Sequence, residues 1–154
     1  MHHNHHDLKV YGGIKLFAGR GTPQLAGRIA KYLKQPLTKA EVFDFPNENI
    51  FVKLKGSVRG QDVYVIQTTS SPVHRNLMEL LIMIQTLRLD SAARITAVIP
   101  YLAYGRSDKK DQPRVPITAR LVADMIECST TLNLFLVPVT KGYKANLLFL
   151  YFYR

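Results

Sequence analysis

Residues 63–99 read VYVIQTTSSPVHRNLMELLIMIQTLRLDSAARITAVI and hold the clearest structural pattern in the chain. The stretch begins with a nearly continuous apolar run, 63–67, and ends with another, 95–99. Such runs are typical of strands that are buried on both faces. Between them, apolar side chains recur at helical spacing over residues 76–89, and extra apolar positions widen the stripe into that of a largely buried helix. This order of strand, helix and strand predicts a parallel sheet.

The same alternation continues on both sides of this stretch. Residues 14–18 predict a strand, and the helix after it has Thr22 as its N-cap, Pro23 at its first position and Pro36 beyond its end. Two further strand candidates flank a turn-forming loop at 45–49. Together these signals predict an α/β domain, a mostly parallel sheet with helices on both faces and an added hairpin. The remaining predicted elements are strands at 40–43 and 50–54 and a helix from Pro116 to about Glu127.

The composition is that of one globular domain. The chain has 154 residues, 47% of them hydrophobic and 21% charged, which is enough for a core and unlike disordered or fibrous proteins. A single cysteine, Cys128, excludes an internal disulfide, so we expect a reducing, cytoplasmic location. We expect no secretory leader, and the most apolar stretch, 147–153, is far shorter than the ~20 residues of a membrane-spanning helix. The histidine-rich start, 1–6, fits a solvated extension, although its histidines could also bind a metal.

Positive charge is concentrated in one part of the chain. The formal net charge is +10, and basic side chains outnumber acidic ones over residues 106–120. A local focus of this kind suits a compact polyanion such as a nucleoside triphosphate. A nucleic-acid interface more often adds exposed aromatic side chains; Tyr101 and Tyr104 come just before the cluster, so nucleic-acid binding remains an alternative. The charged residues are Arg106, Lys109, Lys110, Arg114 and Arg120, with Asp108 and Asp111.

The charged loop from Tyr104 to Arg114 is the best candidate for a binding site. It follows a buried strand and precedes the helix that Pro116 opens, and ligands of open α/β sheets bind beyond the carboxyl ends of the strands. Arginine can clamp a phosphate with two parallel hydrogen bonds, and lysine adds mobile charge. Carboxylates of the loop, such as Asp111, could hold a magnesium-bound water or keep the cations apart. The residues alone leave a solvated charged loop as the alternative.

Three other features are weaker candidates. The segment Gly19-Arg20-Gly21 follows a predicted strand and could cradle a phosphate, although a structural turn is the favoured interpretation. His74 close to Ser70 and Ser71 suggests a base and a nucleophile, but no acid that would orient the histidine is evident. Cys128 is interpreted as an inert buried thiol.

Several segments, in the same order along the chain, resemble the ribose-phosphate diphosphokinases, also called phosphoribosyl diphosphate synthetases. The resemblance covers about residues 14–126 and favours a binding loop over a solvated one. It implies a phosphoribosyltransferase-like fold, use of ATP with Mg2+, and assembly into homo-oligomers or with full-length synthetase subunits. The family's reaction, a step of nucleotide biosynthesis, transfers the diphosphoryl group of MgATP to ribose 5-phosphate. The matching segments are 16–19 with Pro23 and 25–26, then 56–64, 76–84, 98–101, 104–110 and 114–121.

The resemblance implies that the charged loop contacts ATP. Arg106 and Ser107 would make these contacts. We add Asp111, a carboxylate of the same loop, to the predicted ATP site. Ser107 stands where the family usually has glutamine, so one side-chain contact differs in this chain.

The loop 45–49 is similar to the family's second ATP element, which in the assembled enzyme reaches the site of a neighbouring subunit. By this resemblance Phe45 would stack on adenine. Asn47 stands where aspartate or asparagine is usual, and Asn49 stands where the family typically has glutamate. From the residues alone, Phe45 could equally be a core aromatic and the asparagines simple turn formers.

The chain departs from the family after Ile126. The family continues with a glycine-containing turn, a strand and a metal-binding aspartate-leucine-histidine element, whereas residues 128–136 read CSTTLNLFL and no histidine follows His74. The family's second domain, with its ribose-phosphate loop and its catalytic lysine and arginine, has no counterpart. We therefore assign no catalytic residue and no metal ligand. The predicted parts are an amino-terminal extension, 1–13, a domain, 14–127, and a divergent tail, 128–154.

The sequence therefore predicts the amino-terminal, ATP-binding half of a ribose-phosphate diphosphokinase that is inactive alone. A non-catalytic subunit that docks onto full-length synthetase and regulates it is the main alternative. A basic nucleic-acid-binding module is a third and less favoured hypothesis.

Overall fold

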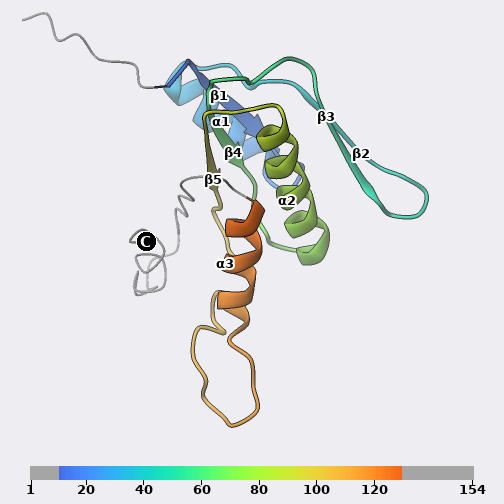
Figure 1. The fold of residues 1–154 in the computed structure, drawn as a ribbon, viewed down its shortest axis with the longest axis vertical. Coiled ribbons are helices and arrows are strands. Elements are labelled where there is room, and N and C mark those ends of the chain that lie inside the picture. Colours follow the sequence, from blue (N-terminus) through green and yellow to red (C-terminus); the bar gives the residue numbers. More distant parts are fainter. Residues whose placement is uncertain (1–10, 130–154) are drawn as a thin grey trace, which may run out of the picture.

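The computed structural model describes residues 11–129. The first ten residues, and the predicted tail apart from its first two residues, lie outside the described part. A parallel sheet has the strand order β1-β4-β5, and an antiparallel hairpin is formed by β2 and β3 (Figure 1). This architecture confirms the predicted α/β fold with an added hairpin. The elements are β1 (Ile14–Ala18), α1 (Pro23–Leu33), β2 (Ala40–Asp44), β3 (Ile50–Leu54), β4 (Asp62–Ile66), α2 (Val73–Leu89), β5 (Arg94–Val98) and α3 (Thr118–Ser129).

Strand β4 lies in the middle of the parallel sheet. Its Val65 pairs with Phe17 of β1 and with Ala97 of β5. Val65 faces the main hydrophobic core, whereas Tyr64 and Ile66 line a pocket of about 300 Å³ between the sheet and α1. Because both faces of the strand meet apolar side chains, its sequence shows a continuous apolar run rather than alternation.

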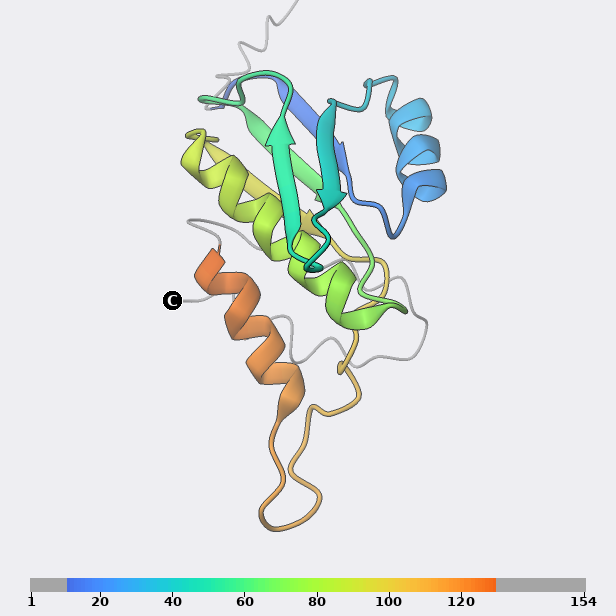
Figure 2. The same cartoon turned by 90° about the vertical axis from the view of Figure 1, so that its right-hand side faces the viewer.

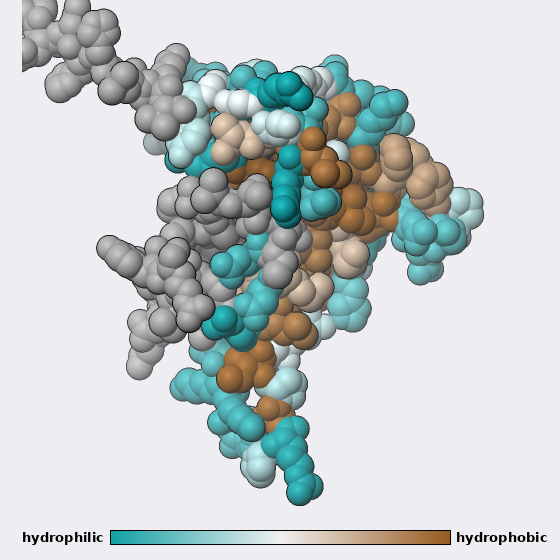
Figure 3. All heavy atoms as spheres, viewed as in Figure 1, coloured by the Kyte–Doolittle hydropathy of each residue, from teal (hydrophilic) through white to brown (hydrophobic). Residues whose placement is uncertain are grey.

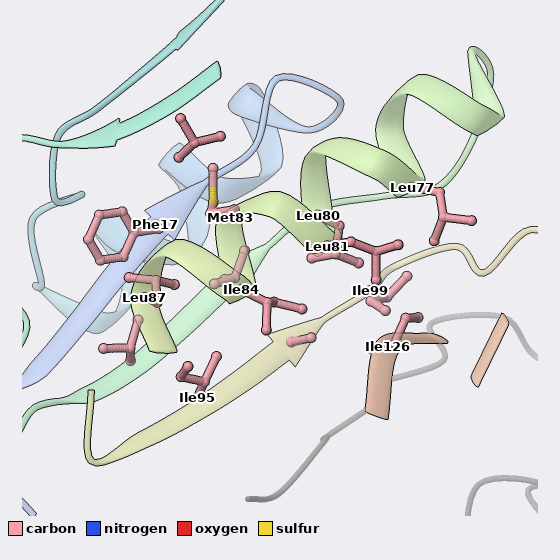
Figure 4. Close-up of a cluster of buried hydrophobic side chains, with 14 of the residues drawn as sticks. Phe17, Leu77, Leu80, Leu81, Met83, Ile84, Leu87, Ile95, Ile99 and Ile126 are labelled. Atoms are coloured by element: carbon pink, nitrogen blue, oxygen red, sulfur yellow. The ribbon is translucent and has the colours of Figure 1, made fainter. Parts of the chain in front are cut away.

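Helix α2 supplies the centre of the core. Its Leu80, Met83, Ile84 and Leu87 are fully buried, and they pack over the face of the sheet opposite α1 (Figure 4). The inner face of the hairpin joins the same cluster through Val52. Helix α3 lies beside α2 and adds Val122 and Ile126 to the same core (Figure 2). Because α1 packs on the opposite face, helices cover both faces of the parallel sheet.

Two predicted helix starts need correction. Helix α2 begins at Val73, three residues before the predicted start, because its first turn carries polar side chains that lie outside the apolar stripe. Helix α3 begins at Thr118 rather than Pro116. The carbonyl of Ile117 accepts hydrogen bonds from the N–H groups of Arg120 (3.1 Å) and Leu121 (3.3 Å), which makes Ile117 the N-cap. Within residues 11–129, no helix is both long and apolar enough to cross a membrane.

Candidate functional site

The carboxyl ends of β1, β4 and β5 meet at one edge of the parallel sheet, where three loops begin. The strand ladder continues into these loops, because the N–H of Gly19 donates to the carbonyl of Ile66 (2.9 Å) and the N–H of Gln67 donates to that of Val98 (3.1 Å). In open α/β sheets this edge is the usual location of a ligand site.

The loop after β1 is a structural turn. The N–H of Arg20 donates to Oε1 of Glu79 (2.6 Å), and the N–H of Gly21 donates to Oε1 of Gln67 (2.9 Å). A Cβ atom at Gly19 would lie 2.3 Å from that same Gln67 oxygen, so any larger residue there would displace the buried Gln67 side chain. Because side chains of the protein already bind these amides, they do not form a phosphate cradle.

The side chain of Arg20 joins three elements of the fold. Its Nε donates to Oε2 of Glu79 on α2 (2.7 Å), and its Nη2 donates to Oδ1 of Asp44 at the end of β2 (2.6 Å). Arg75 of α2 forms a second ion pair with Asp44 (2.8 Å). We call these four residues, Glu79, Arg20, Asp44 and Arg75, the Arg20 bridge. The hydrogen bond from Arg20 holds the pKa of Asp44 below its ordinary value, and the same bond raises the pKa of Arg20.

The loop at the end of the hairpin is exposed. Phe45 is 44% exposed, so it is not a core aromatic. Its ring packs edge-on against Phe43 and Phe51, with ring centroids 5.2 and 5.8 Å away. The turn closes through a hydrogen bond from the N–H of Phe45 to the carbonyl of Asn49 (2.8 Å). The side-chain oxygen of Asn47 accepts from the N–H of Asn49 (3.3 Å), so both asparagines help to form the turn.

The charged loop between β5 and α3 is fixed where it leaves the sheet. The hydroxyl of Thr69 accepts a hydrogen bond from the N–H of Ala103 (2.7 Å) and donates to the carbonyl of Tyr101 (2.9 Å). The hydroxyl of Tyr104 is 2.8 Å from Nε2 of His74, and the two rings stack. His74 therefore holds this loop, and no bond in the described part of the chain pairs it with Ser70 or Ser71 as a base.

The predicted ATP-contact residues of the charged loop differ in their exposure. Arg106 and Asp111 are exposed, and Ser107 is half-buried. Ser107 lies beside the start of α3, because its carbonyl accepts from the N–H of Ala119 (3.1 Å). The tip of the loop is hydrophilic, whereas hydrophobic surface gathers where the hairpin meets α2 (Figure 3).

A single chain does not bring the two groups of predicted residues together. Figures 1 and 2 show the charged loop and the hairpin loop projecting from different parts of the molecule. Each group is assembled within its own loop, Phe45, Asn47 and Asn49 in one and Arg106, Ser107 and Asp111 in the other. Among residues 11–129, no three acidic, histidine or cysteine side chains cluster in a way that could hold a metal ion.

Sequence reasoning missed the Arg20 bridge. One signal was available: Glu79 lies within the apolar stripe of the helix predicted at 76–89, and a carboxylate in such a position needs a charged or hydrogen-bonding partner. The identity of that partner had no signal, because Arg20 is 59 residues away along the chain.

Comparisons with known proteins give consistent results. The profile of the N-terminal domain of ribose phosphate pyrophosphokinase matches residues 14–129. The chain is similar to ribose-phosphate pyrophosphokinases of Wolinella succinogenes (51% identity over 75% of this chain and 37% of the relative) and Clostridium perfringens (55% over 73% and 35%). It is also similar to the crystal structure of phosphoribosylpyrophosphate synthetase from Mycobacterium smegmatis, with a TM-score of 0.81 and 41% identity over 88% of this chain and 45% of that one.

The contacts of Thr69 predict a measurable effect on stability. Thr69→Val should lower the free energy of unfolding by about 1–3 kcal/mol, because it leaves the buried N–H of Ala103 without an acceptor. The matched control is Thr86→Val, which removes a hydroxyl that donates to the carbonyl of Ile82 (2.8 Å) and leaves no donor unpaired. Urea denaturation followed by circular dichroism measures both changes. Equal losses in the two variants would contradict the role assigned to Thr69.

Proposed function

The chain belongs to the ribose-phosphate pyrophosphokinase family, whose amino-terminal domain it matches, and from this we propose that it binds ATP as one half of such an enzyme. It spans little more than a third of the length of the curated relatives named above. The reaction proposed for the complete system transfers the β,γ-diphosphoryl group of MgATP to the anomeric hydroxyl of ribose 5-phosphate. The products are phosphoribosyl diphosphate and AMP.

The observation that best supports ATP binding is the construction of the charged loop. Thr69 and His74 hold its beginning, and the hydrogen bond from Ala119 to Ser107 closes it at the start of α3. Arg106, next to Ser107, and Lys109, inside the closed part, are both exposed. Arg106 could clamp a phosphate with two hydrogen bonds, and Lys109 could follow the charge of a triphosphate. A loop that is fixed at both ends loses less conformational entropy on binding than a free one does.

The hairpin loop supports a site that two chains share. Its Phe45 presents an exposed ring that could stack on adenine, with Asn47 and Asn49 beside it. The charged loop of the same chain projects elsewhere (Figure 1), so the hairpin would serve the site of a neighbouring subunit. We therefore propose a homo-oligomer, or assembly with full-length synthetase subunits.

We propose that Mg2+ binds together with ATP. Mg2+ in phosphoryl-transfer sites is commonly held by one or two carboxylates together with the phosphates of the substrate. Asp108 and Asp111 are the carboxylates of the charged loop, and no three-residue metal cluster exists among residues 11–129. The residues described here do not make a metal site by themselves, and we derive no chemical step through a metal.

Two related proposals concern the role of the chain in the cell. The single cysteine supports a cytoplasmic location. The alternative function, a non-catalytic subunit that regulates full-length synthetase, is supported by the exposed aromatic face of the hairpin, which could dock onto another subunit. The nucleic-acid alternative is less favoured, because the positive charge is concentrated in one loop, although Tyr101 and Tyr104 beside that loop are exposed.

ATP binding is expected to be weak and dependent on the charged loop. Calorimetric titration should give an affinity no tighter than micromolar, falling further at high salt because the contacts are ionic. Arg106→Ala combined with Lys109→Ala should lower the affinity at least about tenfold, since hydrogen bonds to charged groups contribute roughly 1.5–3 kcal/mol each. The control, Arg28→Ala with Lys31→Ala, makes the same change of charge on α1. Submicromolar affinity, or equal effects of the two double variants, would count against the assignment.

The chain alone is expected not to catalyse the reaction, because no acceptor site for ribose 5-phosphate is recognisable in its sequence. Incubation with MgATP and ribose 5-phosphate should release no AMP above a control without protein, as followed by chromatography. Steady AMP release that Arg106→Ala abolishes would overturn this expectation.

A further inference from the structure

The hairpin is attached to the body of the domain in two ways. Its inner face, including Val42 and Val52, packs on the core at α2. Its loop end is attached through Asp44, the last residue of β2, which receives Arg20 on one oxygen and Arg75 on the other. Asp44 immediately precedes Phe45, so any movement of Asp44 moves the aromatic ring that follows it.

The contacts between Arg20 and Glu79 form the buried part of the Arg20 bridge and leave it little freedom. Glu79 has no exposed surface and accepts hydrogen bonds from both the backbone N–H and the Nε of Arg20, and from Nε2 of Gln67 (3.3 Å). A buried carboxylate that lost these partners would carry an uncompensated charge, so the arrangement has little freedom. The guanidinium is planar, which fixes the direction of its second donor toward Asp44.

We propose that Arg20 is a positioning residue: its planar guanidinium, anchored on buried Glu79, fixes Asp44 and thereby the direction in which the hairpin presents loop 45–49. The apolar contacts of the hairpin hold it against α2, and the bridge selects one orientation of its loop end. The consequence for nucleotide binding rests on the proposed function, since it requires Phe45 to contact ATP on a neighbouring chain. The consequence for hairpin geometry does not.

A simple stabilising ion pair is the competing explanation, and the chain contains a matched example of one. Arg94 forms a bidentate pair with Asp62 at the amino-terminal ends of β5 and β4 in the same sheet. The arginine side chains are similarly exposed, 26% for Arg94 and 30% for Arg20, and each pairs with a buried carboxylate. The Arg94 pair joins β4 to β5 and does not touch the hairpin. A merely structural role predicts equal behaviour of the two arginines.

The experiment measures the direction of the hairpin by spin labels. Cysteines replace Glu48 in the hairpin loop and Gln85 on α2, in a Cys128→Ser background, and labelled protein is diluted into unlabelled protein so that only distances within one chain contribute. Double electron–electron resonance should give one narrow distance distribution. Arg20→Lys and Asp44→Ala should each widen this distribution at least about twofold. In the first variant an ammonium group cannot fix two carboxylates as the guanidinium fork does, and in the second the carboxylate that receives Arg20 is removed. Arg94→Lys should leave the distribution unchanged.

The same variants are titrated with ATP. Arg20→Lys and Asp44→Ala should weaken binding at least about threefold through loss of preorganisation, and Arg94→Lys should not. An unchanged distance distribution in the first two variants, or equal widening by Arg94→Lys, overturns the positioning role. Widening without any loss of ATP affinity overturns its link to the nucleotide. If the parent protein binds no ATP, the proposed function fails, while the distance measurement still decides whether Arg20 positions the hairpin.

Discussion

The carboxylate of Glu79 imposes the constraint on which much of this structure depends. It lies without exposed surface on α2, the helix that fills the core, and a buried charge persists only with charged and hydrogen-bonding partners. Arg20 and Gln67 supply those partners from the loops after β1 and β4. One buried group therefore connects the central helix to two loops at the carboxyl ends of the strands and, through Asp44, to the hairpin.

This arrangement separates a rigid body from two projecting elements. The sheet and α2 form a closely packed core, and the charged loop and the hairpin loop extend from it in different directions (Figure 1). Both loops are tied down close to their bases, by Thr69 and His74 in one case and by Arg20 in the other. Elements that are fixed at their bases and exposed at their tips suit a site that forms between two chains rather than within one.

The sequence predicted the elements whose signals are local. Strands β4 and β5 follow from continuous apolar runs and α2 from its apolar stripe, although its start at Val73 lay outside that stripe. The charged loop was a candidate from its residues, whereas the hairpin loop was identified only by resemblance. The resemblance also implied that the two loops serve sites in different chains, which no local pattern in the sequence encodes. The exposure of Phe45 was ambiguous for the same reason. The link from Arg20 to Asp44, 24 residues apart, needed the folded chain to be recognised.

The central claim is that the charged loop of one chain and the hairpin loop of another form one nucleotide site. It is tested most directly by the number of ATP molecules bound when Arg106→Ala protein and Phe45→Ala protein are mixed in equal amounts after subunit exchange. Each variant alone should bind ATP poorly. In the mixture, random assortment of subunits should restore about one quarter of the sites to full affinity, because those sites take an intact loop from each chain. A mixture that binds no better than the separate variants would contradict the claim.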